Sequence, residues 1–281
     1  MQSVIWRLHR PPLDGQFNNP QRLAALRAEF RQLALQTDDA ARANARAIYQ
    51  ATLQRAPGDH WVHENFADFL ESIGDLKEAS AQWQQARELL PENCNAHFQS
   101  GRLLEQLNQF PEARAELLRA VALRSSLTEA WFELGNVYFA ESNFASALQA
   151  FEQAQRLEPQ DASYLAFVGK ALSKLNRHAE AVQHFHQAIQ LDPNLWQAHF
   201  ALADELAADN KFSDAAAEYE AVVKLQPTSA LAHLDAGVML ARVGRFDDAL
   251  GEFDATLRLE PANQQAQEYR ARVQDWKNAK R

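Results

Sequence analysis

Histidines are the first residues of this sequence that could carry chemistry, because imidazole is a common metal ligand and a general acid–base group. The chain has nine of them among its 281 residues. Four of the nine recur at one fixed step along the chain or at multiples of it, so they occupy equivalent places in separate structural units; they are His63, His97, His199 and His233. Two others lie only two residues apart in a helical stretch and therefore face different directions. We expect the four to be packing residues with satisfied ring nitrogens, and we predict no metal site.

Motifs for nucleophilic or acid–base catalysis are missing from the sequence. It has no Gly-x-Ser-x-Gly elbow, no glycine-rich phosphate loop and no His-Glu-x-x-His. The single cysteine, Cys94, falls at the edge of an expected helix, and we interpret it as structural filler. One cysteine permits no intrachain disulfide, which fits a reducing compartment. We predict that the chain is not an enzyme and needs no cofactor.

A fixed period of about 34 residues sets the helices that position these side chains. Prolines recur at this step, and proline ends a helix because it lacks an N–H and disfavours helix in the residue before it. Glycine and asparagine recur between them, and both tolerate the left-handed backbone that closes a helix. The prolines are Pro57, Pro91, Pro159, Pro193, Pro227 and Pro261, with Ser125 in the one gap. The second column is Gly74, Asn108, Ser142, Asn176, Asn210 and Gly244, where serine is the weaker choice.

Good helix caps and bulky inner residues follow the same period. Two places after most of the prolines stands a side chain that can accept a hydrogen bond from the first turn of a helix. These caps are Asp59, Asn93, Asp161, Ser229 and Asn263. The bulky second-helix position holds Trp83, Leu117, Phe151, Phe185, Tyr219 and Phe253. Each unit therefore specifies a helix, a turn, a second helix and a break.

One copy of this pattern resembles the signature of the tetratricopeptide repeat (TPR) family, a helix–turn–helix unit of about 34 residues. It reads Trp131-x2-Leu134-Gly135-x2-Tyr138, then Ala147-x3-Phe151, then Pro159. The resemblance implies an all-α fold, a right-handed α–α superhelix in which each repeat packs on its neighbours. It implies six full repeats within residues 60–263, at 60–93, 94–127, 128–161, 162–195, 196–229 and 230–263.

The residues on either side of the six repeats are expected to close the ends of the array. Residues 20–59 form a degenerate first repeat, because Tyr49 and Pro57 are in phase with Trp83 and Pro91. Residues 264–281 form a polar last helix that solvates the other end. Residues 1–19 contain several Pro, Gly and Asn residues and are expected to be irregular. They either fold back on the first helices or connect to another domain.

The resemblance also implies where a partner would bind. In TPR proteins the first helices line a concave groove, and their second, fifth, ninth, twelfth and thirteenth positions face the ligand. Carried over by position, the candidate partner-binding residues are Glu64, Asp68, Arg102, Phe132, Asn136, Phe139, Lys170 and Lys174. None of them is expected to be catalytic or to bind a metal or a cofactor.

Two helices carry like charges at the spacing of one helical turn. Glu64, Asp68 and Glu71 form an acidic stripe, and Lys170 with Lys174 repeats the spacing with positive sign. Such pairs cost a few tenths of a kcal/mol each, approximately, which suggests that something else pairs with them. The alternative is an ordinary solvated helix face, where charges contribute little.

The positive group has two interpretations that the sequence leaves open. Arg102, Asn136 and the two lysines form an anion-binding patch, or Arg102 is occupied by Glu105, three residues later. Phe132 and Phe139 would add apolar walls, or pack between adjacent first helices. The first interpretation predicts a protein or peptide partner with acidic groups.

Composition excludes several other functions. The net charge is −9, which argues against nucleic acid as the main partner, because such proteins need a basic footprint. No apolar run reaches the roughly 18 residues of a membrane span. Residues 1–10 do not form a signal peptide, because Arg7 interrupts a short apolar patch. We therefore expect a cytoplasmic, monomeric protein.

The sequence as a whole predicts a non-catalytic scaffold that binds a segment of a partner protein in the groove. An alternative of a different class is a docking or spacer region of a larger bacterial enzyme or membrane protein whose catalytic domain lies outside this chain. A third reading, self-assembly through the ends of the array, is opposed by the polar last helix.

Overall fold

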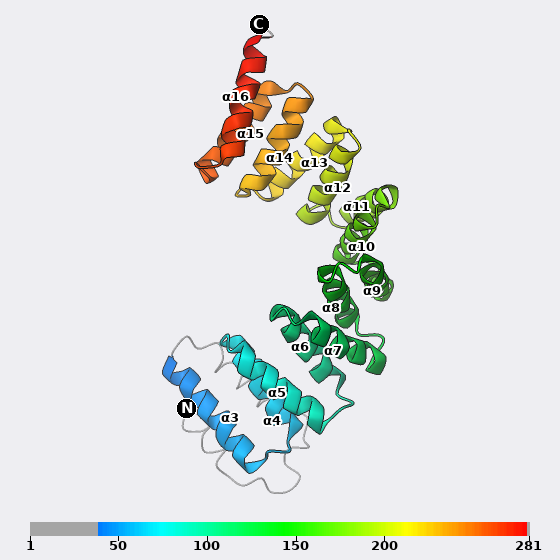
Figure 1. Cartoon of the computed structure of the whole chain (residues 1–281), viewed down its shortest axis with the longest axis vertical. Helices are drawn as coiled ribbons and strands as arrows, with labels where there is room; N and C mark the ends of the chain where they lie inside the picture. Colours follow the sequence, from blue (N-terminus) through cyan, green and yellow to red (C-terminus); the bar gives the residue numbers. More distant parts are fainter. Residues whose placement is uncertain (1–38, 280–281) are drawn as a thin grey trace. The chain divides into compact units, whose positions relative to one another are not determined.

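The computed structural model describes residues 39–279, and within this range it contains fourteen helices and no strand (Figure 1). The expectation of an all-α fold is confirmed. The first helix described is α3 (Asp39–Arg55) and the last is α16 (Gln264–Ala279). The predicted irregular segment 1–19 and the first part of the degenerate repeat, 20–38, lie outside the described residues, as do 280 and 281.

Twelve helices between these two form six pairs of one shorter and one longer helix. The first helices of the pairs are α4 (His60–Ser72), α6 (Cys94–Gln106), α8 (Thr128–Ala140), α10 (Ala162–Lys174), α12 (Trp196–Ala208) and α14 (Ala230–Arg242). The second helices are α5 (Leu76–Leu89), α7 (Phe110–Leu123), α9 (Phe144–Leu157), α11 (His178–Leu191), α13 (Phe212–Leu225) and α15 (Phe246–Leu259). In each pair, the second helix ends two residues before a proline of the periodic column, or before Ser125. Proline disfavours helix in the residue before it, so the helix ends there.

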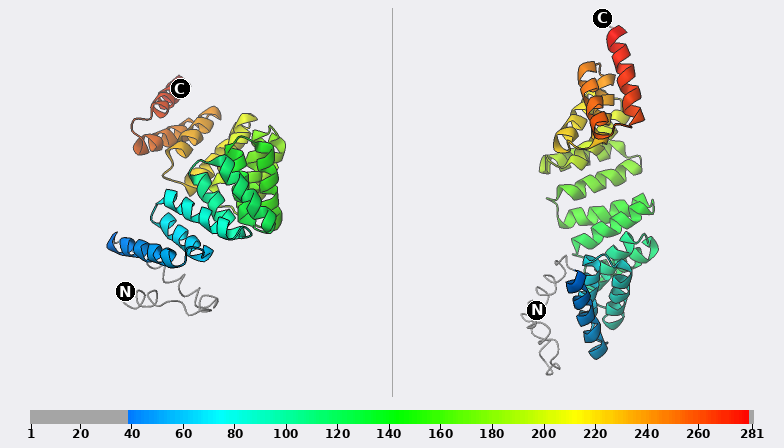
Figure 2. Two further views of the ribbon diagram at one scale, coloured as in Figure 1. Left: turned by 60° about the horizontal axis from the view of Figure 1, so that its bottom comes forward. Right: turned by 90° about the vertical axis from the view of Figure 1, so that its left-hand side faces the viewer.

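The packing groups the chain into two compact units, Met1–Val137 and Tyr138–Arg281, with the boundary inside α8. In the first unit α4 packs on α3 and α5, α5 packs on α6, and α6 packs on α7. In the second unit the same order runs from α9 to α16, and α16 lies against both α15 and α14 (Figure 2). Each helix therefore buries its apolar face mainly against its sequence neighbours, the arrangement of a repeat protein.

The predicted caps hold the starts of several helices. The Asp59 carboxylate accepts a hydrogen bond from the Trp61 N–H at 3.0 Å, and Asn93 accepts from the N–H groups of Asn95 and Ala96. Asp161, Ser229 and Asn263 do the same at α10, α14 and α16. Each bond satisfies one of the four N–H groups that a helix start leaves without a partner.

The turn inside every repeat has the left-handed conformation that its residue type predicts. Among residues 39–279, six have a positive φ: Asn108, Ser142, Asn176 and Asn210 at 58° to 61°, and Gly74 and Gly244 at 82°. The N–H of the next residue bonds back to the last turn of the first helix, as from Asn143 to the Tyr138 carbonyl at 2.8 Å. This backbone bond closes the helix and reverses the chain.

The histidine column is tied to the loop that precedes each repeat. The Nε2 of His97 lies 3.0 Å from the Pro91 carbonyl, and its Nδ1 lies 2.6 Å from Glu116 on α7. The other three histidines of the column make the same two contacts, and Gln82 replaces the glutamate at His63. Trp131 donates to the Ser125 carbonyl at 2.9 Å from the equivalent place. The predicted packing role with satisfied nitrogens is confirmed for all four histidines.

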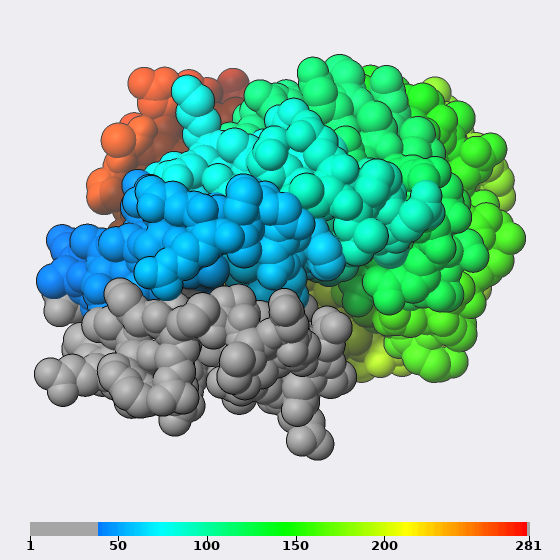
Figure 3. Space-filling view, turned by 90° about the horizontal axis from the view of Figure 1, so that it is seen from below, coloured from blue at the N-terminus to red at the C-terminus, as the bar shows by residue number. Residues whose placement is uncertain are grey.

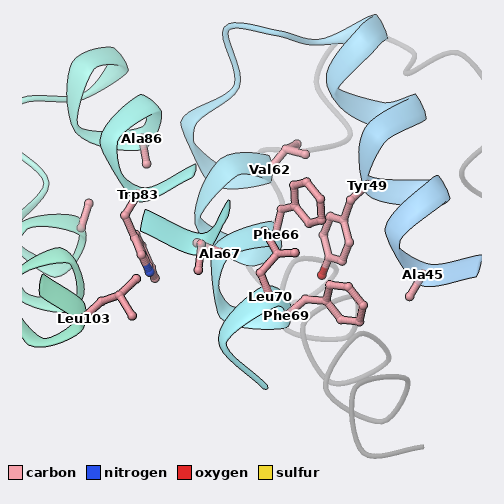
Figure 4. Close-up of a cluster of buried hydrophobic side chains, with 12 residues drawn as sticks. Ala45, Tyr49, Val62, Phe66, Ala67, Phe69, Leu70, Trp83, Ala86 and Leu103 are labelled. Carbon is pink, nitrogen blue, oxygen red and sulfur yellow. The ribbon is translucent and has the colours of Figure 1, made fainter. Parts of the chain in front are cut away.

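Tyr49 anchors α3 to the first unit, as its phase with Trp83 predicts. Its ring stacks on Phe66 with 5.0 Å between centroids and lies 5.5 Å from Phe69 (Figure 4). Tyr49, Phe66 and Trp83 are at most 3% exposed. In the space-filling view α3 and α4 form a continuous surface (Figure 3). Helix α3 therefore extends the core of the first full repeat.

Close approach of the two helices in a repeat depends on a small residue facing a bulky one. A Cβ built on Gly237 would lie 2.7 Å from the Phe253 ring, and one on Gly169 would lie 2.6 Å from Phe185. Gly101 faces Leu117 in the same way. The bulky residues are fully buried, so they have no free space to move into.

We predict that Gly237→Ala destabilises the protein although alanine favours helix. Overpacking against Phe253 costs about 1–3 kcal/mol, and the gain in helix propensity returns up to about 1 kcal/mol. Gly251→Ala is the matched control, because Gly251 lies in α15 with nothing within 4 Å of an added Cβ. It should stabilise by roughly 0.5–1 kcal/mol. Urea denaturation of both variants checks this, and a Gly237→Ala protein as stable as wild type would contradict the close approach.

We predict that Ser142→Asn raises the free energy of unfolding by roughly 0.5 kcal/mol, because asparagine tolerates the left-handed backbone better than serine. Ser142 is exposed and has a φ of 61°, so the backbone term should dominate. The reverse change at the equivalent place, Asn176→Ser, should lower stability by a similar amount. Both are measured by thermal and urea unfolding; effects of the same sign in the two variants would refute the argument.

Candidate functional site

Glu64 lies on the face of α4 that the sequence predicted for binding, and it is buried. Its residue exposure is only 7%, and its Oε1 lies 2.7 Å from His60 Nδ1 and accepts a hydrogen bond from Asn93 Nδ2 at 2.7 Å. Asn65 beside it is equally buried and donates to the Trp61 carbonyl. These contacts fix the orientation of the carboxylate before any ligand arrives.

A hollow of about 1280 Å³ opens beside Glu64 in the first unit. It lies along the first helices α4 and α6, and Tyr49 of α3 and the loops before α6 and after α7 complete its walls. Asp68, one turn after Glu64, lies at the same hollow and is exposed. We refer to this feature below as the α4–α6 hollow. It brings Glu64 and Asp68 together, as the acidic stripe predicted.

Arg102 does not serve as a free cation. Its Nη2 lies 2.5 Å from Glu71 Oε2 on the preceding repeat, and its Nε donates to Gln99 at 3.0 Å. The other oxygen of Glu71 accepts from the indole of the buried Trp83 at 2.6 Å. The sequence interpretations placed its partner in a ligand or in Glu105; in the structure its ion-pair partner is Glu71, and its charge also acts on Glu105. The anion patch loses its arginine because Glu71 neutralises the guanidinium within the fold.

Asn136 and Glu133 lie on α8 in the first unit, next to a half-buried carboxyl of α6. Asn136 donates to Glu133 Oε2 at 3.0 Å. Glu133 is also hydrogen-bonded to Glu105, which requires that one of the two carboxyls keeps a proton. Burial, and then the charge of Glu133, raise the pKa of Glu105 from 4.5 to about 7. Phe132 on the same helix is partly buried.

The two lysines of the predicted patch lie on α10, which belongs to the second unit, whereas Arg102 and Asn136 belong to the first. Lys170 is half-buried, and its Nζ lies 4.9 Å above the Phe167 ring; burial lowers the pKa of this amine. Lys174 is exposed in the last turn of α10. Phe139 packs edge-on against Phe144, with 5.1 Å between ring centroids. This contact favours the packing interpretation of Phe139.

The second unit also carries acidic groups that sequence reasoning did not single out. Tyr219 donates its hydroxyl to Asp204, which neighbours Asp235 of the next first helix. Burial, and then the charge of Asp204, raise the pKa of Asp235 to about 6. Glu205 accepts from Ser173 and lies 2.7 Å from His178 Nδ1. A spacing of about one repeat, as between Ser173 and Glu205, is the signal that could have revealed the contacts between repeats, whereas Tyr219 and Asp204 lie within one repeat.

Comparison with known proteins assigns the repeat. The family model described as "Tetratricopeptide repeat" matches residues 65–128, 129–195, 200–263 and 240–275. The chain belongs to the tetratricopeptide repeat family. This confirms the resemblance on which the groove positions of the TPR helices were based. No curated protein of known function matches the sequence significantly.

Solved TPR structures resemble the chain over most of its length. The structure titled "YrrB: a TPR protein with an unusual peptide-binding site" shares 26% identity and a TM-score of 0.54, covering 66% of this chain and 96% of that one. Pseudomonas aeruginosa pilF shares 18% identity and a TM-score of 0.64 over 78% and 99%. The C-terminal part of a TPR repeat-containing protein from Cytophaga hutchinsonii shares 16% and 0.68 over 85% and 98%. At identities of 18% and 16%, the similarity to pilF and to the Cytophaga hutchinsonii protein shows a shared fold and nothing about function.

Two general features of the TPR helices bear on the type of site. In residues 39–279 no helix combines the length and the apolar character needed to cross a bilayer. Across the same range, His, Cys, Asp and Glu do not gather in threes in a way that could hold a metal ion. The arrangement that the described residues do offer is a polar hollow with fixed side chains, which suits recognition of a ligand.

We predict that Glu105 makes stability fall as pH rises. The folded carboxyl keeps its proton up to about pH 7, whereas the unfolded one loses it near 4.5, so the free energy of unfolding decreases across this window. Glu105→Gln preserves a neutral donor toward Glu133 and removes the effect. Because solvent screens a half-buried group, we expect Glu105→Gln to be more stable than wild type by about 1 kcal/mol at pH 8. At pH 4.5 the two proteins should have nearly the same free energy of unfolding.

The measurement is urea denaturation of wild type and Glu105→Gln at pH 4.5, 6 and 8. Glu112→Gln is the control, because Glu112 is exposed on α7 and its replacement removes the same charge. Taking the difference between variants cancels other titrating groups, Asp235 included. A constant difference between wild type and Glu105→Gln at all three pH values would show that the carboxyl pair does not share a proton.

Proposed function

We propose that this TPR protein is a non-catalytic interaction module that binds a segment of a partner protein on the exposed faces of its first helices. The observation that carries the proposal is the α4–α6 hollow, about 1280 Å³ in volume and lined by fixed polar and aromatic side chains. Its volume exceeds the roughly 300–1,000 Å³ of ordinary small-molecule pockets, so a polypeptide segment suits it better. YrrB, which is 26% identical to this chain, is described as a TPR protein with an unusual peptide-binding site, and this supports the same kind of ligand.

The second unit would contribute through α10. A half-buried amine such as Lys170 has lost part of its hydration, so it gains most from an acidic group that a partner brings to it. Lys174 lies one turn further and is exposed. The proposal of a partner with acidic groups therefore rests on these two lysines and no longer on Arg102. We place the protein in the cytoplasm as a monomer, on the basis of its single cysteine and polar last helix.

The test is co-precipitation from a lysate of the source cell, with bound proteins quantified by mass spectrometry. We expect Lys170→Glu/Lys174→Glu to lose at least one partner that wild type captures, because each charge-assisted contact contributes about 1.5–3 kcal/mol. The matched control is Lys224→Glu, a reversal at an exposed lysine of the second helix α13. Circular dichroism and the melting temperature must agree among the three proteins.

The control decides where partners bind. If the α10 variant keeps every partner and Lys224→Glu loses one, the partners bind the second helices. That result would contradict the proposal. Loss in both variants at unchanged stability would point to nonspecific attraction to charge, which a repeat at higher salt would reveal.

A further inference from the structure

The hollow beside α4 and α6 has the charge of a cation-binding site. Three of its lining residues are carboxylic acids, Glu64, Asp68 and Glu92, against one guanidinium, Arg124. Glu92 already pairs with Arg119 at 2.9 Å, so the acids of interest are Glu64 and Asp68. Arg124 is exposed and follows the end of α7. Four of the other lining residues carry side-chain amides, which can accept hydrogen bonds as well as donate them.

Glu64 is the acid of the hollow that would gain most from a cationic partner, because Asp68 and Glu92 are exposed. Its side chain is 10% exposed, so the carboxylate has lost most of its hydration. A buried carboxylate is costly unless a cation and hydrogen bonds compensate it. Among residues 39–279 the one basic side chain next to it is His60, whose Nδ1 lies 2.7 Å from Glu64 Oε1. No arginine or lysine nitrogen of that range lies within 4 Å of the carboxylate.

Glu71 on the same helix shows what the chain does where it neutralises such an acid itself. Glu71 is 13% exposed at its side chain, and Arg102 of the next repeat pairs with it at 2.5 Å. At Glu64 the next repeat supplies Asn93, an amide without charge. Within residues 39–279 the two acids therefore have different partners: Glu71 has an arginine, whereas Glu64 has His60 and the amide of Asn93.

The aromatic walls of the hollow suit the same ligand. Trp61, which is partly buried, lines it together with the carboxylates. Tyr49 and Phe69 line it as well, but their rings are almost wholly buried against each other. Arginine and lysine carry a long apolar stem below the charge, and both are attracted to aromatic faces. A site that combines a fixed carboxylate with aromatic surface matches such a side chain in both of its parts.

We propose that the α4–α6 hollow binds a basic peptide segment of a partner protein, with an arginine or lysine side chain paired to Glu64. The inference rests on the proposed function and adds the charge of the ligand at this unit. The hollow is too large for a single side chain, so flanking residues of the peptide would meet Asn65, Gln99 and Asp68.

The test uses the full chain as bait for a random dodecapeptide library displayed on phage. We expect the enriched peptides to share an arginine or a lysine. One enriched peptide is then labelled with a fluorophore, and its affinity is measured by anisotropy for wild type, Glu64→Gln and Glu112→Gln. Glu64→Gln should weaken binding by about tenfold or more, and the exposed control Glu112→Gln should leave it unchanged.

A second peptide, with its basic residue replaced by glutamine, completes a double-mutant cycle. Replacing the basic residue should weaken binding of the peptide to wild type but hardly to Glu64→Gln, because the basic residue and Glu64 form one pair. Equal losses in both proteins would overturn the assignment of Glu64. Matching thermal unfolding of Glu64→Gln and wild type shows that the variant folds.

The outcomes separate this inference from the proposed function. Enrichment of acidic or purely apolar peptides would overturn the basic ligand while leaving a peptide-binding TPR module. Absence of enrichment above a bait-free selection would also overturn it, and the co-precipitation experiment with α10 variants decides independently whether the protein binds partners.

Discussion

The close approach of the two helices within each repeat is the constraint on which the structure depends. A glycine or alanine on the first helix allows a bulky residue of the second helix to lie against its backbone, as Phe253 does at Gly237. This contact sets the distance between the helices and removes the largest rings from water. The turn, the caps and the proline break all serve to return the chain to the same contact one repeat later. The polar first-helix faces are what remains once this packing is complete.

Several polar pairs join groups from neighbouring repeats. Glu71 meets Arg102, Glu64 meets Asn93, and Ser173 meets Glu205, each pair about one repeat apart in sequence. These contacts link adjacent first helices across the surface where a ligand would lie. Side chains at this surface therefore have a structural role as well as a possible binding role, and the two compete for the same charges. A group that the next repeat leaves without a countercharge is the better candidate for recognition.

The sequence predicted the fold well because the fold is local. Proline, left-handed turn residues and caps act within a few residues, so Ser142 and Asp59 could be assigned from their own neighbourhoods. The site was harder, because its contacts join residues from different repeats. The stripe of Glu64, Asp68 and Glu71 was judged by spacing along one helix, which could not distinguish the acid with an arginine partner from the acid beside a hollow. The carboxyl pair of Glu105 and Glu133 could not be predicted for the same reason.

In the full repeats, a side chain near the start of the first helix bonds to a carbonyl of the preceding loop, with one exception. That exception bears on where the array unfolds locally. In five of them a histidine or Trp131 holds the carbonyl six residues earlier, and Gln267 does so for the last helix. The equivalent place on α10 is Leu165, whose side chain has no donor for the Pro159 carbonyl. The loop between α9 and α10 therefore lacks a side-chain hydrogen bond that the loops before the other full repeats have. Opening this loop breaks one hydrogen bond fewer than opening the equivalent loops, so local unfolding there costs less free energy where the other contacts are equal.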